Sequence, residues 1–330
     1  MSTESQLNVD FETRSDVNIN AEGDNYFLSP ETAVYCMGWA FDDEPVQMWV
    51  AEREPFPERV IDHIKADGVI NAWNARFERW VYWYVLCNDF PEVPVPAMHQ
   101  FQCTAARARA HGLPGKLALC AQAMGLPLQK MSEGTRLIRE YCAKNVHWDD
   151  IPEDDQLLML SYCETDVGVE RQIGTFRREL TEDEQYEDPL NEYINDRGVP
   201  VEVPMAEAAM EYATEIQDDV DAKVRALTGG KVDNAKQRTN RDDWVLPQLT
   251  PEQIRAITNK KKKKISFDEN HRAALAVMPG VPQAVMDYLT LMEEAGGATV
   301  SKYKAMSQRH IDGRLTGALI WNGAGQTGRF

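Results

Sequence analysis

Two acidic residues, Asp10 and Glu12, stand two positions apart near the start of the chain. Leu7, Val9 and Phe11 alternate with polar residues around them, and this period of two predicts a β-strand. Alternate residues of a strand face the same side, so the two carboxylates lie side by side. Neighbouring carboxylates repel one another unless water or a cation intervenes, so the pair indicates either a cation site or a solvated strand face.

A further acid follows a second predicted strand. Residues 69–73 form a short apolar run that is typical of a buried strand, and residues 76–86 have helical spacing. Asn74 and Glu78 lie where this strand passes into the helix, and ligands tend to bind at the ends of strands in α/β sheets. The sequence therefore predicts that Glu78 faces a cleft, with the Asn74 amide free to donate and accept hydrogen bonds there.

A late helix carries the last candidate groups. Residues 152–180 predict one long helix, because Pro152 suits a first turn and three acids follow it. Tyr162 and Asp166 are four residues apart, so they stack on one face of this helix. Taken alone, such a pair is also typical of any amphipathic helix.

The acids are more informative together than singly. An acidic pair on the first strand, an acid opening a central helix and an acid on a late helix can meet in one cleft. Oxygen ligands of this kind suit Mg²⁺. Two such ions about 3.5–4 Å apart activate a water and stabilise the leaving oxygen of a phosphodiester. The pattern therefore indicates two-metal phosphodiester chemistry that needs no His or Cys.

Strands and helices alternate in the part of the chain that must position these acids. Alternating and apolar patterns predict strands over residues 7–11, 33–41, 46–50 and 69–73. Helical spacing predicts helices over residues 56–66, 76–86, 104–110, 116–124 and 152–180. This alternation predicts an α/β fold.

The second part of the chain has a different pattern. Residues 181–188 are polar and acidic and Pro189 follows them, so we expect a domain boundary there, between residues 185 and 186. Beyond it the spacing is mostly helical, and it predicts helices over residues 205–227, 251–257, 271–278 and 283–295.

Composition indicates a soluble, globular, cytosolic protein. Of 330 residues, 43% are hydrophobic and 27% are charged, and no apolar run is long enough to cross a bilayer. Residues 1–7 lack the basic start and the apolar stretch of a secretion signal. The six cysteines form no C-x-x-C pair, so we interpret them as small apolar residues in a reducing compartment.

The charge is unevenly distributed. The formal net charge is −18, yet residues 231–330 hold 16 Lys and Arg against 10 Asp and Glu, which is +6. Residues 1–230 therefore carry −24. An acidic first part can gather cations while a basic second part holds a polyanion. The run Lys260–Lys264 is interpreted either as a grip on phosphates or as a solvated face.

The candidate residues resemble the three motifs of the DEDD exonucleases. Asp10-Phe11-Glu12-Thr13 resembles the first motif, Asn74-x-x-Phe77-Glu78 the second, and Tyr162-x-x-x-Asp166 the third in its tyrosine form. Their order and separation are most similar to the proofreading domain of phage-type family A DNA polymerases. The resemblance implies a ribonuclease H-like fold, a mixed sheet flanked by helices. One departure is Glu78, because the family usually has Asp there.

The resemblance extends into the second part of the chain. Residues 191–201, 301–306, 312–315 and 323–329 are similar, in the expected order, to segments that open a family A polymerase domain. This implies a 3′→5′ exonuclease domain over residues 1–185. Residues 186–330 would be the start of the palm and the thumb, without the polymerase active site. No polymerisation by this chain alone is expected, and the chain would be either a truncation or one half of a split polymerase.

The resemblance also implies roles for individual residues. Asp10, Glu12 and Asp166 would bind the two Mg²⁺ or Mn²⁺ ions directly, Glu78 would assist, and Tyr162 would orient the attacking water. The residues implied to hold DNA, as a single-stranded 3′ end or a primer–template duplex, are Thr13, Asn74, Phe77, Lys260, Lys261, Lys262, Lys263, Lys264, Lys302, Lys304 and Arg329.

The activity implied is proofreading in the cytoplasm of a bacterial or phage-infected host cell, without membrane contact. Two alternatives stay open. One is a catalytically weak DNA-binding scaffold for a second chain that carries the rest of the polymerase. The other is a DEDD RNA exonuclease, which the polymerase-like second part disfavours.

Overall fold

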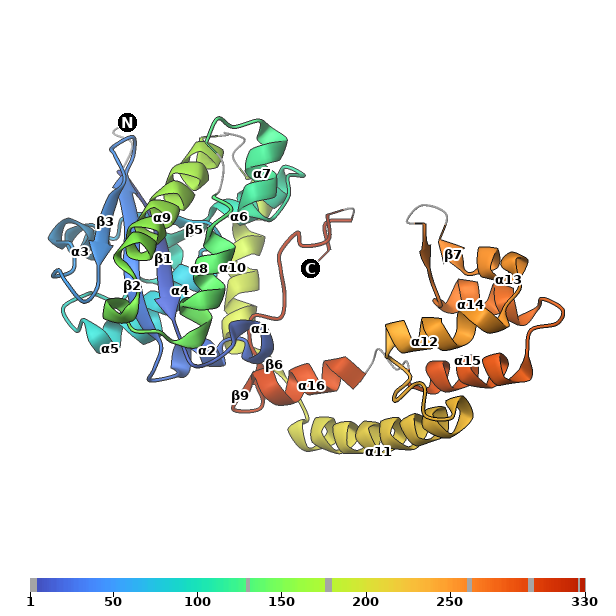
Figure 1. Cartoon of the computed structure of the whole chain (residues 1–330). Helices are drawn as coiled ribbons and strands as arrows, with labels where there is room; N and C mark the ends of the chain where they lie inside the picture. Colours follow the sequence, from blue (N-terminus) through green and yellow to red (C-terminus); the bar gives the residue numbers. More distant parts are fainter. Residues whose placement is uncertain are drawn as a thin grey trace. The chain divides into compact units, whose positions relative to one another are not determined.

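Five strands form the central sheet of the chain in the computed structural model (Figure 1), which describes residues 5–128, 131–175, 180–259, 263–295, 300–325 and 327–329. The strands are β1 (Gln6–Arg14), β2 (Ala33–Phe41), β3 (Gln47–Val50), β4 (Val69–Ala72) and β5 (Phe101–Cys103), in the spatial order β3-β2-β1-β4-β5. β1 is antiparallel to β2 and parallel to β4, and β4 is parallel to β5. The sheet is therefore mixed, which confirms the predicted α/β class.

The two faces of β1 meet different helices. Leu7, Val9 and Phe11 point to one face and join a core cluster with residues of α3 (Glu58–Lys65) and of the π-helix η1 (Val81–Leu86). The long helix α9 (Glu153–Gly174) packs against β1 and β2. Because side chains alternate along a strand, Asp10 and Glu12 belong to the face opposite the Leu7–Phe11 stripe.

The remaining helices connect these strands and cover the sheet. They are α1 (Ile19–Glu22), α2 (Asn25–Leu28), α4 (Arg76–Trp80), α5 (Cys87–Asp89), α6 (Thr104–Ala110), α7 (Leu117–Met124), α8 (Gly134–Glu140) and α10 (Glu182–Arg197). Three short 3₁₀ turns lie at Met98–Gln100, Cys142–Lys144 and Trp148–Asp150. The helices predicted over residues 56–66, 104–110 and 116–124 are confirmed within a few residues.

Several elements differ from the sequence prediction, and strand β5 and helix α8 were not predicted. The helix predicted over residues 76–86 is a short α-helix that continues as a π-helix. The helix predicted over residues 152–180 ends at Gly174. Helix α10 runs through the acidic segment in which a boundary was expected. It begins at a capping box of Thr181 and Glu184, and it tolerates Pro189 in its interior.

The chain divides into two compact units, Met1–Val201 with Gln308–Phe330, and Glu202–Ser307. The expected boundary between residues 185 and 186 therefore falls inside α10, within the first unit. A small antiparallel sheet of β6 (Val199–Pro200), β10 (Arg314–Leu315) and β9 (His310–Ile311) ties the last part of the chain to this unit. Helix α10 is held in the first unit by ion pairs of its partly buried Glu192 and Asp196 with the buried Arg79.

The second unit is mostly helical, as predicted. It holds α11 (Val203–Thr228), α12 (Arg238–Val245), a 3₁₀ turn at Leu246–Gln248, α13 (Pro251–Ala256), the hairpin of β7 (Thr258–Asn259) and β8 (Lys264–Ile265), α14 (Glu269–Ala276), α15 (Gln283–Ala295) and most of α16 (Val300–Arg309). Its own core includes Val220, Val224, Val245, Leu275, Val285 and Tyr288. In the part of the chain that the structure describes, no helix is both long and apolar enough to span a membrane.

Candidate active site

Strand β1 carries the first acidic pair, and helix α9 lies close against it. The Cys163 thiol of α9 donates to the Asp10 carbonyl at 3.4 Å and accepts the Gly38 amide of β2 at 3.2 Å. Gly38 is the partner of Asp10 in the sheet register, and a Cβ there would stand 2.9 Å from the Val167 side chain. The glycine therefore allows α9 to approach the strand beside Asp10.

Tyr162 and Asp166 on α9 face the acidic pair. Both are buried, with 3% and 4% of their surface exposed. Burial raises the pKa of the Tyr162 hydroxyl far above its usual value, and the charges of Glu12, Asp166 and Asp10 raise it further. A hydrogen bond to Asp166 adds to the same shift. Three of the predicted acids thus lie within electrostatic reach of Tyr162.

Glu78 reaches the same place from the first turn of α4, directly after β4. It is 2% exposed, and its Oε2 atom is buried without a hydrogen-bond partner. Burial raises the pKa of the Glu78 carboxyl well above its usual range. The charge of Asp10 raises it next, ahead of those of Glu170 and Glu12. Glu78 therefore lies within electrostatic reach of both acids of the first motif.

One acid of this neighbourhood was missed by the sequence analysis. Glu170 lies one turn beyond Asp166 on α9 and is 2% exposed. The Thr104 hydroxyl donates to its Oε1 atom at 2.5 Å. Burial raises the pKa of Glu170 to about 8, against a lowering by the Thr104 hydrogen bond and with a further increase from the charge of Asp10. The spacing of four residues from Asp166 was the available signal.

The donor atoms around Tyr162 are of the kind that divalent cations prefer. All are carboxylate or hydroxyl oxygens, which suit Mg²⁺ or Mn²⁺, and the buried Oε2 of Glu78 has no competing partner. Within the described ranges, however, no three His, Cys, Asp or Glu side chains stand close enough together to hold one ion. Like charges favour separated side chains. The ligand atoms are of the kind that binds a divalent cation. To coordinate one, the side chains would have to adopt rotamers that bring their oxygens closer together.

A glycine that the sequence analysis did not single out borders Tyr162. Gly134 is the first residue of α8, and a Cβ there would stand 2.1 Å from Cε2 of the Tyr162 ring. No real Cβ approaches another heavy atom so closely, so any larger residue would displace the ring. Gly134 is 28 positions from Tyr162 in the chain, and only the three-dimensional structure reveals this contact.

The predicted nucleotide-holding residues border the acids. Asn74 is exposed in the turn between β4 and α4, with a φ of 67°, which Asn adopts more readily than most residues. The half-buried ring of Phe77 contacts the rings of Tyr26 and Phe27. Thr13 is buried, and its hydroxyl hydrogen-bonds the Tyr26 hydroxyl at 2.5 Å.

The predicted phosphate-binding lysines lie in the second unit. Lys263 and Lys264 are exposed at the β7–β8 hairpin, and Lys302 and Lys304 are exposed on α16. Lys260, Lys261 and Lys262 lie outside the described residues. Arg329 is exposed and belongs to the first unit.

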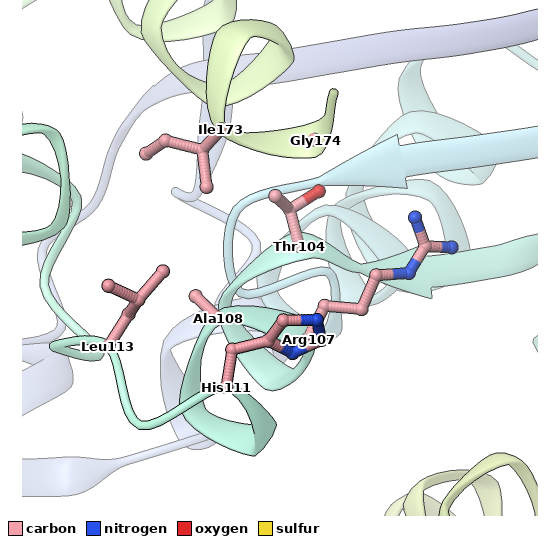
Figure 2. Close-up of a pocket in the computed structure, with 7 residues that line it drawn as sticks. All are labelled: Thr104, Arg107, Ala108, His111, Leu113, Ile173 and Gly174. Atoms are coloured by element: carbon pink, nitrogen blue, oxygen red, sulfur yellow. The ribbon is translucent and has the colours of Figure 1, made fainter. Parts of the chain in front are cut away.

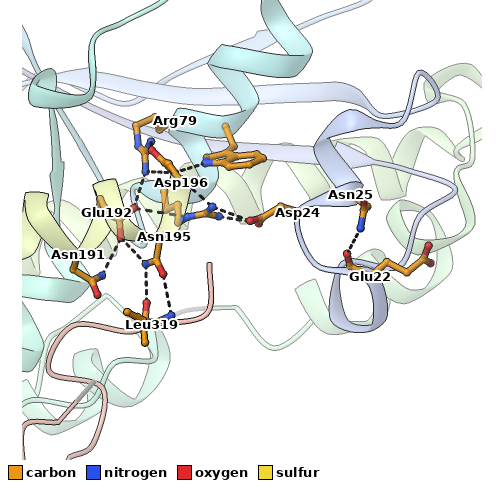
Figure 3. Close-up of polar contacts among 11 residues, drawn as sticks. Glu22, Asp24, Asn25, Arg79, Asn191, Glu192, Asn195, Asp196 and Leu319 are labelled. Carbon is orange, nitrogen blue, oxygen red and sulfur yellow. Dashed lines mark hydrogen bonds and ion pairs between the residues drawn. The ribbon is translucent and has the colours of Figure 1, made fainter. Parts of the chain in front are cut away.

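A network of buried ion pairs holds α4, the helix of Glu78. Arg76 pairs with Asp24 at 2.7 Å, and Arg79 pairs with Glu192 at 2.7 Å and with Asp196. Figure 3 shows Arg79 against these two acids of α10, and Asn195 beside them reaching Leu319. The Asn195 side chain donates to the Leu319 carbonyl at 2.8 Å and accepts its amide at 2.9 Å. The network therefore connects α4 to α10 and to the last segment of the chain.

A small pocket lies on the other side of Thr104 (Figure 2). It is lined by Thr104, Arg107, Ala108, His111, Leu113, Ile173 and Gly174, from α6, α9 and the loop after α6. None of the motif acids lines it, and the sequence analysis predicted no site there. Thr104 connects this pocket to the acidic site through its hydrogen bond to Glu170, and the charge of Arg107, which also lines the pocket, lowers the pKa of Glu170.

The fold and site together define a mixed α/β protein in which carboxylates from β1 and α9 lie within electrostatic reach of one tyrosine, and a buried carboxyl of α4 lies within reach of the β1 pair. A comparison with protein-family models found no match. The chain is 30% identical to a DNA polymerase of Bacillus phage SP02, over 98% of its own length and 49% of that polymerase. It is therefore related to a phage DNA polymerase, as its motifs predicted, and it spans about half the length of that relative.

A solved structure gives a weaker likeness. The POL domain of Pol1 from M. smegmatis, in complex with DNA primer-template and dNTP, matches 95% of this chain and 48% of that chain. The identity is 12% and the TM-score is 0.46. A likeness of this size adds no argument about fold or function.

Proposed function

We propose that the chain is the 3′→5′ proofreading exonuclease portion of a family A DNA polymerase, and that it releases nucleoside monophosphates from a single-stranded 3′ end. The first unit would have the ribonuclease H-like fold that the motifs imply. The observation that supports the proposal is that Asp10, Glu12 and Asp166 lie within electrostatic reach of Tyr162, while the buried Glu78 lies within reach of Asp10 and Glu12. The relationship to a phage DNA polymerase supports DNA as the substrate.

The acids would bind the cations, and the tyrosine would donate a hydrogen bond from its own hydroxyl. Asp10, Glu12 and Asp166 would be direct ligands, and Glu78 would assist from the buried side. Two divalent cations, when bound, would supply activation of a water and stabilisation of the leaving oxygen. The Tyr162 hydroxyl is protonated at neutral pH, like that of any tyrosine, and burial raises its pKa further, so it can act as a hydrogen-bond donor that orients the attacking water.

Neighbouring residues would present the DNA strand to these acids. Asn74 and Phe77 follow β4 directly before Glu78, and they would hold the last nucleotides by hydrogen bonding and stacking. Thr13 would contribute from the end of β1. The exposed lysines of the second unit would hold phosphates of the duplex, together with Arg329.

Two observations favour a second candidate function, a DNA-holding scaffold with little catalysis of its own. No three potential ligands stand at coordinating distance in the described part of the chain, and Glu78 replaces the usual Asp. In that case a separate polymerase chain would be the partner. A DEDD exonuclease that acts on RNA is disfavoured, because the relative is a DNA polymerase.

A trimming assay separates these functions. The full chain is incubated with 5′-labelled single-stranded DNA and Mg²⁺ or Mn²⁺, and the products are resolved by length. We expect a ladder that shortens from the 3′ end, release of mononucleotides, and arrest by a 3′-terminal phosphorothioate linkage or by chelator. Intact DNA in both metals would favour the scaffold, and equal trimming of RNA of the same sequence would favour the RNA exonuclease.

Gly134 provides a test of the role of Tyr162. Gly134→Ala is expected to displace the Tyr162 ring, because the new Cβ would overlap it. Misplacement of an orienting group by about 1 Å costs roughly 10–100-fold in rate, so kcat for trimming should fall while KM for DNA changes little.

Gly174→Ala is the matched control, since a Cβ there meets nothing within 4 Å. It should leave kcat unchanged. Equal kcat values for Gly134→Ala and the wild type would show that the position of this ring does not limit trimming.

A further inference from the structure

Glu170 is a buried acid that the proposed mechanism does not use. It lies four residues beyond Asp166 on α9, so the two carboxyls share one face of the helix. Only 2% of Glu170 is exposed. Burying an ionisable side chain at such a position destabilises the folded state unless its oxygens form hydrogen bonds. A buried Glu170 is therefore expected to have a function.

One oxygen of the Glu170 carboxyl has a hydrogen-bond partner and the other has none. Thr104 donates to Oε1 at 2.5 Å, which fixes the orientation of the group. The Oε2 atom is fully buried and has no hydrogen-bond partner. A purely structural acceptor for Thr104 would need only one oxygen, and a glutamine would provide it without a charge. The second oxygen is therefore placed for a ligand that the fold itself does not supply.

Glu78 has a carboxyl oxygen in the same condition as Oε2 of Glu170. Its own Oε2 is equally buried and without a partner, and Glu170 and Glu78 lie within electrostatic reach of each other. The charge of Asp10 acts on both carboxyls. Each of these two carboxyls, one on α4 and one on α9, therefore has a buried oxygen without a hydrogen-bond partner and lies within electrostatic reach of Asp10. A cation satisfies such oxygens better than a neutral donor does.

We propose that Glu170, held in place by Thr104, is a further acid of this site and takes part with Glu78 in binding a divalent cation. The proposal deepens the proposed function, on which it rests, by adding a residue that the three motifs do not contain. It also gives Glu78 a partner in binding the cation, since Glu170 lies within its electrostatic reach.

Binding of Mn²⁺ to the full chain tests the proposal without reference to activity. Free Mn²⁺ is measured by electron paramagnetic resonance during titration of the wild type, Glu170→Gln and Glu164→Gln. Glu164 lies on the same helix and is exposed, so its variant is the matched control. Loss of an acid from a metal site weakens binding by about 10–100-fold, and we expect this for Glu170→Gln alone.

Thermal unfolding without metal separates this role from a structural one. Glu170→Gln keeps an acceptor for Thr104 and removes an ionisable buried group, so its Tm should equal or exceed that of the wild type. Thr104→Val is a second variant that keeps the acid and removes its anchor. We expect it to weaken Mn²⁺ binding less than Glu170→Gln does.

The outcomes distinguish this proposal from the proposed function. Mn²⁺ binding by Glu170→Gln and Thr104→Val that matches the wild type would overturn the role of Glu170, even if the wild type trims DNA. Absence of Mn²⁺ binding by the wild type would overturn it as well. Weakened binding in both variants would support it, even if no trimming is found and the exonuclease function fails.

Discussion

Replacing Asp10 and Glu12 by alanine is expected to lower the rate of 3′ trimming at least about 10³-fold, which corresponds to roughly 4 kcal/mol of barrier height. Both acids lie on β1 within electrostatic reach of Tyr162, and no other pair in this site stands on one strand. Without them the cations that would activate the water lose two ligands. The measurement is the initial rate on 5′-labelled single-stranded DNA in saturating Mg²⁺ and in Mn²⁺.

The fold should survive this change. Glu12 is 8% exposed and Asp10 is partly exposed, and removing two like charges relieves repulsion in a buried, acidic place. The urea midpoint of unfolding should therefore be equal to or higher than that of the wild type. Asp10→Asn with Glu12→Gln is a second variant that keeps shape and removes only charge.

The control is a pair of exposed acids on α9, Asp154 and Glu164, replaced by alanine together. This variant should trim at the rate of the wild type. If the Asp10 and Glu12 variants also trimmed normally, the acidic pair would be excluded from catalysis. The exonuclease proposal would then have to be abandoned.

The strands and helices of the first unit could be predicted well where the residue pattern lies within a single element. The alternation around Asp10 predicted β1, and the acids after Pro152 predicted the start of α9. Spacing also placed Tyr162 and Asp166 on one helical face, and the structure adds a hydrogen bond between them. These predictions succeeded because strand and helix periods determine which side chains share a face.

Other features of the site depend on contacts between distant segments. Gly134 and Gly38 matter because Tyr162 and α9 approach them, which no local pattern indicates. Glu170 had a local signal, its spacing from Asp166, but the orphaned oxygen that gives it interest appears only in three dimensions. Sequence motifs therefore identify the acids of the site and leave out the residues that position them.

Helix α10 had a signal that was overlooked. Thr181 and Glu184 form a capping box, and three acids occupy the first turn, where they favour the helix dipole. The polar composition and Pro189 outweighed these features in the prediction. The helix is stable in the structure because Glu192 and Asp196 pair with arginines of α4, a stabilisation that comes from tertiary structure and not from the helix itself.

Those ion pairs lead to the second large effect, a loss of roughly 3–5 kcal/mol of unfolding free energy on replacing Arg79 by alanine. The Arg79 side chain is 2% exposed and pairs with both Glu192 and Asp196. Its guanidinium also lies 4.7 Å from the centre of the Trp83 ring. Its removal would leave the two partly buried carboxylates of α10 with the longer ion pairs to Arg76, at 3.8 Å for Glu192 and 3.5 Å for Asp196, and with the Trp80 indole, which donates to Asp196 at 3.0 Å.

Urea unfolding followed by near-ultraviolet circular dichroism measures this loss through the tryptophans of α4 and η1. The control is Arg53→Ala, because Arg53 and Asp149 form an exposed pair at 3.5 Å whose loss should cost about 0–1 kcal/mol. Asp196→Ala made in the Arg79→Ala background should cost less than it does alone, since the two residues share one interaction. A loss below about 1 kcal/mol for Arg79→Ala would mean that this ion-pair network does not hold α4. The position of Glu78 near Asp10 would then depend on other contacts. A large loss of unfolding free energy together with reduced trimming would instead show that α10 positions Glu78, the buried acid of the second motif.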